Sequence, residues 1–226
     1  MNKIDKLLAE FPPYSEVLGI DLTMPAGRFR WFLASILFGA RISEKIAANA
    51  YREFEKAGVD APEKILSAGW DELVRILDEG GYVRYDESTA TNLLNIMEDL
   101  MERYGSLEGL HSGSSDTEDL EKRLQDFKGI GPVTAQIFLR ELRGVWDVAP
   151  EPSERAEEAA RCLEIDLQEF EGEKLSRVEA ALVRLHLRFC KREKCPECPM
   201  KEYCGCGFRH GQLNTNEKEG YRGVSP

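Results

Sequence analysis

FKGIGPVTA, at residues 127–135, joins two segments whose apolar residues recur at helical spacing. The segment before it spans residues 118–127, and the segment after it spans residues 133–143. The intervening glycines and proline favour a tight turn at residues 128–132 over a continuous helix. The sequence therefore predicts a helix, a short turn and a second helix in this region.

The residue types of this turn suit a phosphate-binding role. Gly129 and Gly131 permit the positive φ values and the close backbone approach that a short turn requires. We expect Ile130 to fill the space between the helices, and Thr134 and Ala135 to be small enough for close packing. Amide groups at the start of the second helix, with the helix dipole behind them, form a seat for an anion such as a DNA phosphate.

An ordinary helical hairpin with glycines at its turn is the alternative, and a lone Gly-x-Gly would favour it. The full string with an amphipathic helix on each side favours contact with the DNA backbone, which positions a duplex without reading its sequence. The predicted contacts from the turn are Lys128, Gly129, Ile130, Gly131, Val133 and Thr134.

Most of the remaining chain also has helical periodicity, and no alternating pattern supports a sheet. The sequence predicts a loop at residues 110–117 and a loose polar tail at 207–226. Helices are expected at residues 28–38, from the cap Ser43 to about 57, 62–68, 70–78, 88–104, from Ser153 or Glu154 to 163, and 174–189. The predicted fold class is therefore all-α.

Bulk composition limits the possible settings of the protein. Hydrophobic residues make up 42% of the 226 residues, which is enough for a core, and no apolar run approaches the ~18 residues of a membrane span. Residues 1–11 lack the features of a signal peptide, so we expect a cytoplasmic protein without membrane contact.

Charge is distributed unevenly along the chain. The net charge is −11, which by itself disfavours nucleic-acid binding. Residues 147–173 hold ten acids and two bases, whereas residues 184–209 hold seven bases and three acids. The protein can therefore present one basic face despite its acidic total.

Five of the six cysteines fall within residues 190–206, a clustering that favours a metal site over a disulfide framework. The spacing is C-x4-C-x2-C-x5-C, formed by Cys190, Cys195, Cys198 and Cys204. Four thiolates within fifteen residues favour a [4Fe–4S] cluster over Zn²⁺, which usually pairs two separated C-x2-C knuckles.

The remaining cysteines and the basic residues of this segment have two interpretations each. Cys206 is a spare that replaces Cys204 if the loop runs differently, and Cys162 is expected to be a small buried residue. The bases between the first two ligands form either a solvated loop or a phosphate-facing surface; they are Lys191, Arg192 and Lys194.

The order of these features resembles endonuclease III and its relatives, the helix–hairpin–helix superfamily of base-excision DNA glycosylases. The resemblance covers residues 28–204 and includes WFLASIL at 31–37, the turn at Gly81-Tyr82 and the string LHLRFC at 185–190. It implies a two-lobed all-α fold with a [4Fe–4S] loop and a DNA-binding cleft into which the target base is flipped. We expect one lobe at residues 1–27 and 128–206, the other at 28–127, and a flexible tail at 207–226.

The resemblance also locates two catalytic positions. Members that form a Schiff base place a lysine two residues after the second glycine of the turn, and here that residue is Val133. Active members place an aspartate just before the helix that follows the hairpin, and here that position is Ser153 or, shifted by one, Pro152. Lyase chemistry through a lysine is therefore not expected.

Three carboxylates are candidates to replace the missing aspartate. Glu151 and Glu154 flank the position, and Asp147 follows Trp146, although each is also explained as a surface acid in an acidic region. Arg41 is either the wedge that fills the gap left by a flipped base or a phosphate contact. Aromatic residues that stack on an extruded base or belong to the core are Tyr82, Tyr85, Trp31 and Trp146.

Three functions agree with the sequence. The first is a monomeric, monofunctional DNA N-glycosylase that hydrolyses the glycosidic bond of a damaged or mismatched base in double-stranded DNA, cytoplasmic and nucleoid-associated in a prokaryote. The second is a catalytically inactive relative that binds damaged or structured DNA, or senses redox state through the cluster. The third is a zinc-stabilised helical protein that does not bind nucleic acid. The enzyme is favoured slightly, by analogy with the family.

Overall fold

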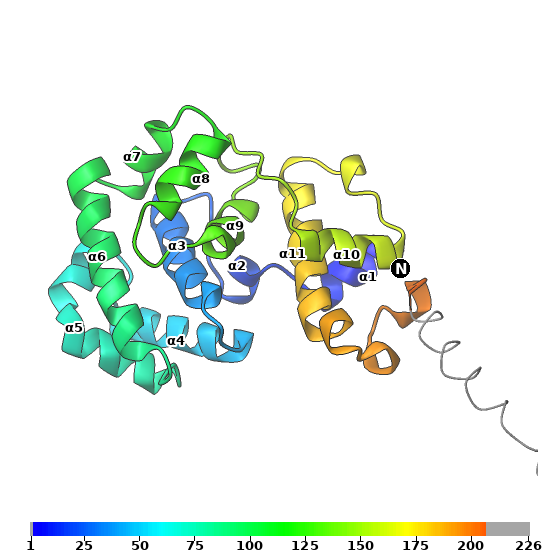
Figure 1. The fold of residues 1–226 in the computed structure, drawn as a ribbon, viewed down its shortest axis with the longest axis horizontal. Helices are drawn as coiled ribbons and strands as arrows, with labels where there is room; N and C mark the ends of the chain where they lie inside the picture. Colours follow the sequence, from blue (N-terminus) through cyan, green and yellow to red (C-terminus); the bar gives the residue numbers. More distant parts are fainter. Residues whose placement is uncertain (1, 207–226) are drawn as a thin grey trace, which may run out of the picture. The chain divides into compact units, whose positions relative to one another are not determined.

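The computed structural model describes residues 2–206 of the protein, and within them the regular structure is helical (Figure 1). The only β-type pairing among these residues is an isolated bridge between Arg143 and Trp146. The α-helices are α1 (Lys3–Glu10), α2 (Tyr14–Val17), α3 (Pro25–Gly39), α4 (Glu44–Ala57), α5 (Pro62–Glu79), α6 (Asp86–Tyr104), α7 (Leu107–Ser112), α8 (Thr117–Gln125), α9 (Pro132–Arg140), α10 (Glu154–Leu163) and α11 (Gly172–Arg188). The all-α prediction is confirmed, and the predicted tail at 207–226 lies outside the described residues.

The chain divides into two compact units, one continuous and one discontinuous. The continuous unit comprises Pro13–Glu151, and the other combines Met1–Pro12 with Pro152–Pro226. These boundaries differ from the expected ones near residues 27 and 127. The reason is that α9 packs against α3, which places the hairpin in the continuous unit.

The continuous unit is built around α3, which is buried along most of its length. Helices α4 and α9 pack against α3, and α5 and α6 run side by side, as Figure 1 shows. Trp31 is fully buried in α3, and its indole N–H donates to the carbonyl of Phe138 in α9 at 3.1 Å. Because that bond satisfies the indole, Trp31 is a core residue.

Several predicted helix ends are confirmed. Ser43 caps α4 by accepting a hydrogen bond from the Ile46 amide at 3.3 Å, and Gly105 ends α6 with a left-handed backbone. Gly69 has φ 72° and ψ 175° inside α5, which divides that element into the two predicted segments. Residues such as these act locally, so their effect is visible in the sequence.

The loop predicted at residues 110–117 is wrong in its first part. Residues Leu107–Ser112 form α7, which Ser106 caps by accepting the Gly109 amide at 3.0 Å. Leu107 and Leu110 are buried in the core, 4% and 0% exposed. Burial of these two leucines outweighs the weak helix propensity of the serines and glycines around them.

The discontinuous unit is formed by helices from both ends of its sequence. Helices α10 and α11 pack together, and α1 lies against α11. Leu7 and Phe11 are 0% and 1% exposed in the core of this unit. The Lys3 ammonium donates to the carbonyls of Leu163 and Glu164 at the end of α10. Among the described residues, no helix combines the length and apolar character needed to cross a membrane.

Candidate nucleic-acid interface and cysteine loop

The predicted hairpin is formed by α8, the turn and α9. The Ile130 amide donates to the Phe127 carbonyl at 3.0 Å, and Gly129 has φ +101°. A Cβ at Gly129 would lie 2.7 Å from Asn92 Nδ2, closer than van der Waals contact allows. The turn therefore requires glycine at this position for both conformation and space.

The second glycine of the turn has a different role. Gly131 has φ −100° and is the N-cap of α9, and nothing lies within 4 Å of a Cβ placed there. No side chain caps this helix end, and Pro132 occupies its first turn. The first-turn amides of α9 are therefore left without a side-chain acceptor, which is the arrangement of an anion seat.

Two of the other hairpin residues are buried and two are exposed. Ile130 is 5% exposed and Thr134 5% exposed, with the Thr134 hydroxyl packed against Gly39 of α3. The Thr134 side chain is therefore not available to a ligand. Lys128 is exposed, and Val133 is 43% exposed. Because Val133 is apolar yet faces solvent, core packing does not account for it.

The three candidate carboxylates are all exposed: Asp147, Glu151 and Glu154. Asp147 and Glu151 lie in the segment after α9, where the Ala149 amide donates to Thr117 Oγ1 at 3.0 Å. Glu154 begins α10 and belongs to the other unit.

Ser153, at the position where the family resemblance places an aspartate, caps α10. Its hydroxyl accepts the Ala156 amide at 3.4 Å, and its own amide donates to Glu179 Oε1 at 2.9 Å. Ser153 is 6% exposed and Glu179 is fully buried. Both residues therefore hold the start of α10.

Most of the proposed base-stacking aromatics belong to the core. Tyr82 is fully buried, and its hydroxyl donates to the Leu37 carbonyl at 2.9 Å. Trp146 is 7% exposed, and the ring of His111 stacks on it at 4.1 Å. Tyr85 is half-buried, with the Arg84 guanidinium 5.3 Å from its ring centroid. Of the four aromatics, only Tyr85 retains a partly accessible ring.

Arg41 is exposed in the turn between α3 and α4. The backbone of this turn is tight, because the Ile42 amide donates to the Ala40 carbonyl at 2.8 Å. The guanidinium is therefore presented to solvent from a well-defined turn.

The cysteine loop, residues 190–206, follows α11 and consists of short 3-10 turns at Cys190–Arg192, Cys195–Glu197 and Lys201–Tyr203. Cys198 is 7% exposed and Met200 is fully buried in the core of the discontinuous unit. The basic residues between the first two cysteines are all exposed: Lys191, Arg192 and Lys194. The loop therefore presents its basic side chains outward and anchors itself through Cys198 and Met200.

The four predicted ligands are free thiols. Burial, together with smaller contributions from the neighbouring sulfurs of Cys198, Cys204 and Cys195, raises the pKa of Cys190 to about 11. Within residues 2–206, no three His, Cys, Asp or Glu side chains stand close enough together to hold a single metal ion. A [4Fe–4S] cluster has a different requirement, because each thiolate binds a separate iron. The donor set of four thiols suits that cluster.

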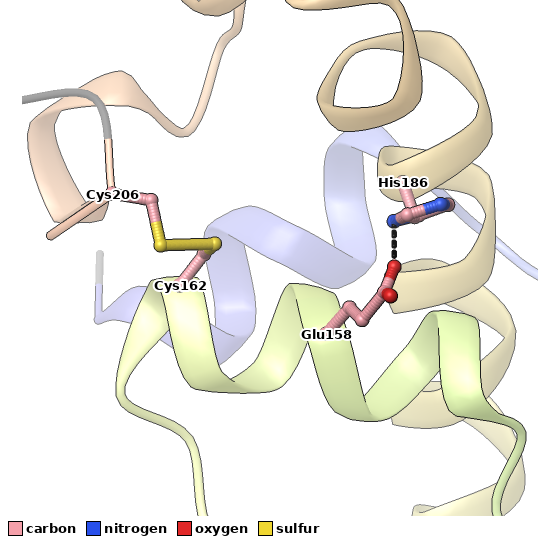
Figure 2. Close-up of a disulfide and its surroundings, with 4 residues drawn as sticks. All are labelled: Glu158, Cys162, His186 and Cys206. Carbon is pink, nitrogen blue, oxygen red and sulfur yellow. Dashed lines mark ion pairs between the residues drawn. A yellow bond between two sulfur atoms is a disulfide. The ribbon is translucent and has the colours of Figure 1, made fainter. Parts of the chain in front are cut away.

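The two remaining cysteines form a disulfide, Cys162–Cys206, which the sequence interpretation did not include (Figure 2). The expectation that Cys162 is a buried small residue is wrong, because Cys162 is half-buried and covalently paired. Cys206 is likewise not available to replace Cys204. The sequence did contain a signal for this disulfide, because a set of four ligands among six cysteines leaves two cysteines that can pair.

No protein-family model matches the sequence, and no curated protein matches it either. Solved structures do match the fold. The H. pylori 3-methyladenine DNA glycosylase MagIII, bound to 1,N6-ethenoadenine, has a TM-score of 0.52 at 16% identity, with 85% of this chain and 99% of that chain covered.

Two endonuclease III structures also match. A non-covalent complex with DNA has a TM-score of 0.56 at 17% identity and covers 94% of this chain and 99% of that chain. A trapped covalent intermediate with DNA, described as an estranged-adenine complex, has a TM-score of 0.53 at 14% identity. The match covers 93% of this chain and 99% of that chain. At these identities the likeness establishes the fold, which is that of endonuclease III and MagIII.

Proposed function

We propose that the protein belongs to the endonuclease III-like superfamily and binds duplex DNA through the α8–α9 hairpin. The observation that carries the proposal is the start of α9, where the first-turn amides have no side-chain cap and nothing lies within 4 Å of a Cβ placed on Gly131. Exposed Lys128 adds a positive charge to the same turn. A phosphate gains both hydrogen bonds and the favourable end of the helix dipole there.

Gly131→Ala tests this seat without disturbing the fold. The added methyl meets no protein atom within 4 Å and the φ of −100° suits alanine, so the melting temperature should be unchanged. The methyl projects where a phosphate would approach, so duplex affinity should fall about tenfold, or ~1.4 kcal/mol. Fluorescence anisotropy on a labelled duplex at fixed salt measures the effect. Unchanged affinity would count against the seat.

Exposed lysines provide a second test of the same surface. Lys128→Gln should weaken duplex binding and lower the salt dependence of log K by about 0.9. Lys56→Gln is the matched control, since Lys56 is exposed in the same unit but pairs with Glu53 at the end of α4. Equal losses in both variants would indicate a general charge effect instead of a hairpin contact.

We further propose that the protein is a monofunctional DNA N-glycosylase, monomeric and acting on chromosomal DNA inside the cell. Val133 cannot form a Schiff base, so hydrolysis by water is the remaining route. Glu151, Glu154 or Asp147 would activate that water or stabilise the charge that grows on the sugar. Arg41 would contact the duplex beside the flipped base.

Base release from duplexes containing uracil, mismatched thymine, alkylated bases or oxidised bases tests this activity. Release on at least one duplex, abolished in Glu151→Gln or Glu154→Gln, is the expected result. Both side chains are exposed, so neither substitution should alter folding. No adduct should be trapped by borohydride. An absence of base release on every duplex would eliminate the enzyme.

A second candidate is a DNA-binding protein without catalysis. Ser153 and Val133 favour it, because one is a buried helix cap and the other is an aliphatic side chain at the two positions where the family resemblance places catalytic groups. Duplex binding that depends on Gly131, together with no base release, would support this candidate.

The four thiols of Cys190, Cys195, Cys198 and Cys204 would hold a [4Fe–4S] cluster in either case. The cluster would cross-link the loop and carry redox chemistry. Lys191, Arg192 and Lys194 would then face the DNA backbone. Iron and sulfide analysis of the purified protein tests this, and stoichiometric zinc without iron would exclude it.

A further inference from the structure

The disulfide lies at the end of the cysteine loop. Cys162 is in the last turn of α10, and Cys206 follows Cys204 by two residues. Their Cα atoms are 5.1 Å apart, within the usual range for disulfides. The Gly205 amide also donates to the Cys162 carbonyl at 2.8 Å. The end of the loop is thus joined to the end of α10 (Figure 2).

The segment that this bond holds has no fully buried side chain among its described residues. Met200 is fully buried, but none of the described residues 201–206 is. Lys6 contributes two contacts, an ion pair with Glu202 at 3.4 Å and a position 5.5 Å from the Tyr203 ring centroid. Glu202 is 71% exposed, so the pair contributes little. Tyr203 and Cys204 are partly buried against the core of the discontinuous unit. Beyond Cys204, the described segment is held by the Gly205–Cys162 hydrogen bond and by the disulfide, which is the covalent link in this part of the chain.

Both cysteines are half-buried, so a small thiol has access to them. A protein that acts on DNA inside the cell, which is the proposed function on which this step rests, encounters thiol reductants continually. From these observations we propose that Cys162 and Cys206 form a reversible redox switch. The oxidised pair ties the end of residues 201–206 to α10, and the reduced pair loosens that end.

The switch is an exchange with a low-molecular-weight disulfide such as oxidised glutathione. One cysteine sulfur attacks the glutathione disulfide and expels one glutathione thiol. The second cysteine then attacks the mixed disulfide and expels the other. Two protein S–H bonds are lost, one S–S bond forms, and both protons and both electrons end on two molecules of glutathione. Reduction reverses each step.

The consequence concerns the choice of ligands. Reduction frees Cys206 two residues from Cys204, in a segment without a buried side chain. The reduced loop then offers five thiols where the oxidised loop offers four. The oxidised state restricts the donor set to Cys190, Cys195, Cys198 and Cys204.

The full-length protein tests the switch directly. It is equilibrated in a series of glutathione redox ratios, and differential alkylation with mass spectrometry reports the state of each cysteine. The Cys162–Cys206 pair should convert from disulfide to dithiol within the range of ratios found in cells. Amide hydrogen exchange in residues 201–206 should rise on reduction, whereas exchange in α11 should not change. A disulfide that persists at every ratio, or equal exchange in both states, would overturn the proposal.

Two single variants separate the restraint from the ligand choice. Cys162→Ser and Cys206→Ser both remove the disulfide, but only Cys162→Ser leaves Cys206 free. Exchange in residues 201–206 should match the reduced wild type in both variants. In iron-loaded protein, partial alkylation should be shared between Cys204 and Cys206 in Cys162→Ser, whereas Cys204 should stay protected in Cys206→Ser. Protection of Cys204 in both variants would show that the disulfide does not govern ligand choice.

The experiments on the switch do not depend on DNA. A chain that switches but binds no duplex would overturn the proposed function and leave the redox behaviour established. A chain that binds duplex DNA while its disulfide resists reduction would overturn the switch alone.

Discussion

The hairpin and the cysteine loop both present exposed basic residues, yet different forces hold them. In the hairpin, Ile130 and Phe127 are buried in the large core of the continuous unit, and one glycine conformation closes the turn. In the cysteine loop, only Cys198 and Met200 are buried, and one disulfide joins the end of the loop to α10. The position of the hairpin therefore depends on side-chain packing, whereas the position of the cysteine loop also depends on whether its disulfide is oxidised or reduced.

The largest expected effect is a fall in the unfolding free energy of the discontinuous unit when its disulfide is removed. The bond closes a loop with a sequence separation of 44, which corresponds to about 4 kcal/mol of unfolding free energy by the chain-entropy relation. The double variant Cys162→Ala, Cys206→Ala should lose that amount in urea unfolding, and the continuous unit should be unaffected. Reduced wild-type protein is the control and should unfold with the double variant. A difference between those two samples would mean that the substitutions act by another route.

The next effect is in the hairpin. Gly129→Ala forces a side chain into a left-handed conformation and against Asn92, which should cost about 2 kcal/mol. Thermal unfolding measures this as a lowered melting temperature. Gly131→Ala is the matched control and should leave stability unchanged. Equal destabilisation by both substitutions would contradict the distinction between a glycine required by conformation and a glycine required by ligand access.

A smaller effect concerns the basic side chains of the cysteine loop. Lys191→Gln and Lys194→Gln should each lower the salt dependence of duplex binding by about 0.9 in log K per log salt. Lys191 and Lys194 both precede Cys198, which is buried and anchors the loop. Reduction of the disulfide should therefore change their contribution to the salt dependence less than unfolding would. Anisotropy titrations at several salt concentrations measure the slope. Slopes identical to wild type would place these lysines away from DNA.

The smallest expected effect compares one histidine in each unit. Burial lowers the pKa of His111 and of His186 below the ordinary value of 6.5, although Glu158 opposes the shift at His186 across 3.3 Å. The unfolded chain therefore binds protons first as the pH falls below 6.5, which destabilises the folded state, and stability is independent of these groups above 6.5. Figure 2 shows the His186–Glu158 pair.

Urea unfolding on both sides of pH 6.5 measures this dependence. His111→Asn should reduce it in the continuous unit only, and His186→Asn should reduce it in the discontinuous unit only. A change in the opposite unit would contradict the assignment of each histidine to its own core.

Features set by neighbouring residues were predictable from the sequence, whereas features set by packing were not. Ser43 and Gly105 act within one turn of helix, so their positions predicted a helix start and a helix end. Separate helices were predicted on either side of residue 69, where the structure has the non-helical Gly69. The disulfide partner of Cys206 lies 44 residues away, and cysteine spacing alone does not define connectivity.

The boundary between units and the burial of aromatics depend on tertiary contacts in the same way. The periodicity of α9 predicts a helix but does not specify that α3 is its neighbour. The stack of His111 on Trp146 joins residues from two segments, so Trp146 was open to interpretation as a stacking platform. Helix existence is encoded locally, whereas the availability of a side chain is decided by its neighbours in space.

The discontinuous unit has a consequence for synthesis on the ribosome. Leu7 and Phe11 are buried against α10 and α11, but the 139 residues of Pro13–Glu151 must be translated before those helices emerge. At ordinary elongation rates the delay is roughly 7–30 s. During that time the continuous unit can fold, while α1 exposes an apolar face that has no intramolecular partner. Until α10 and α11 are translated, Leu7 and Phe11 therefore lack the helices that bury them.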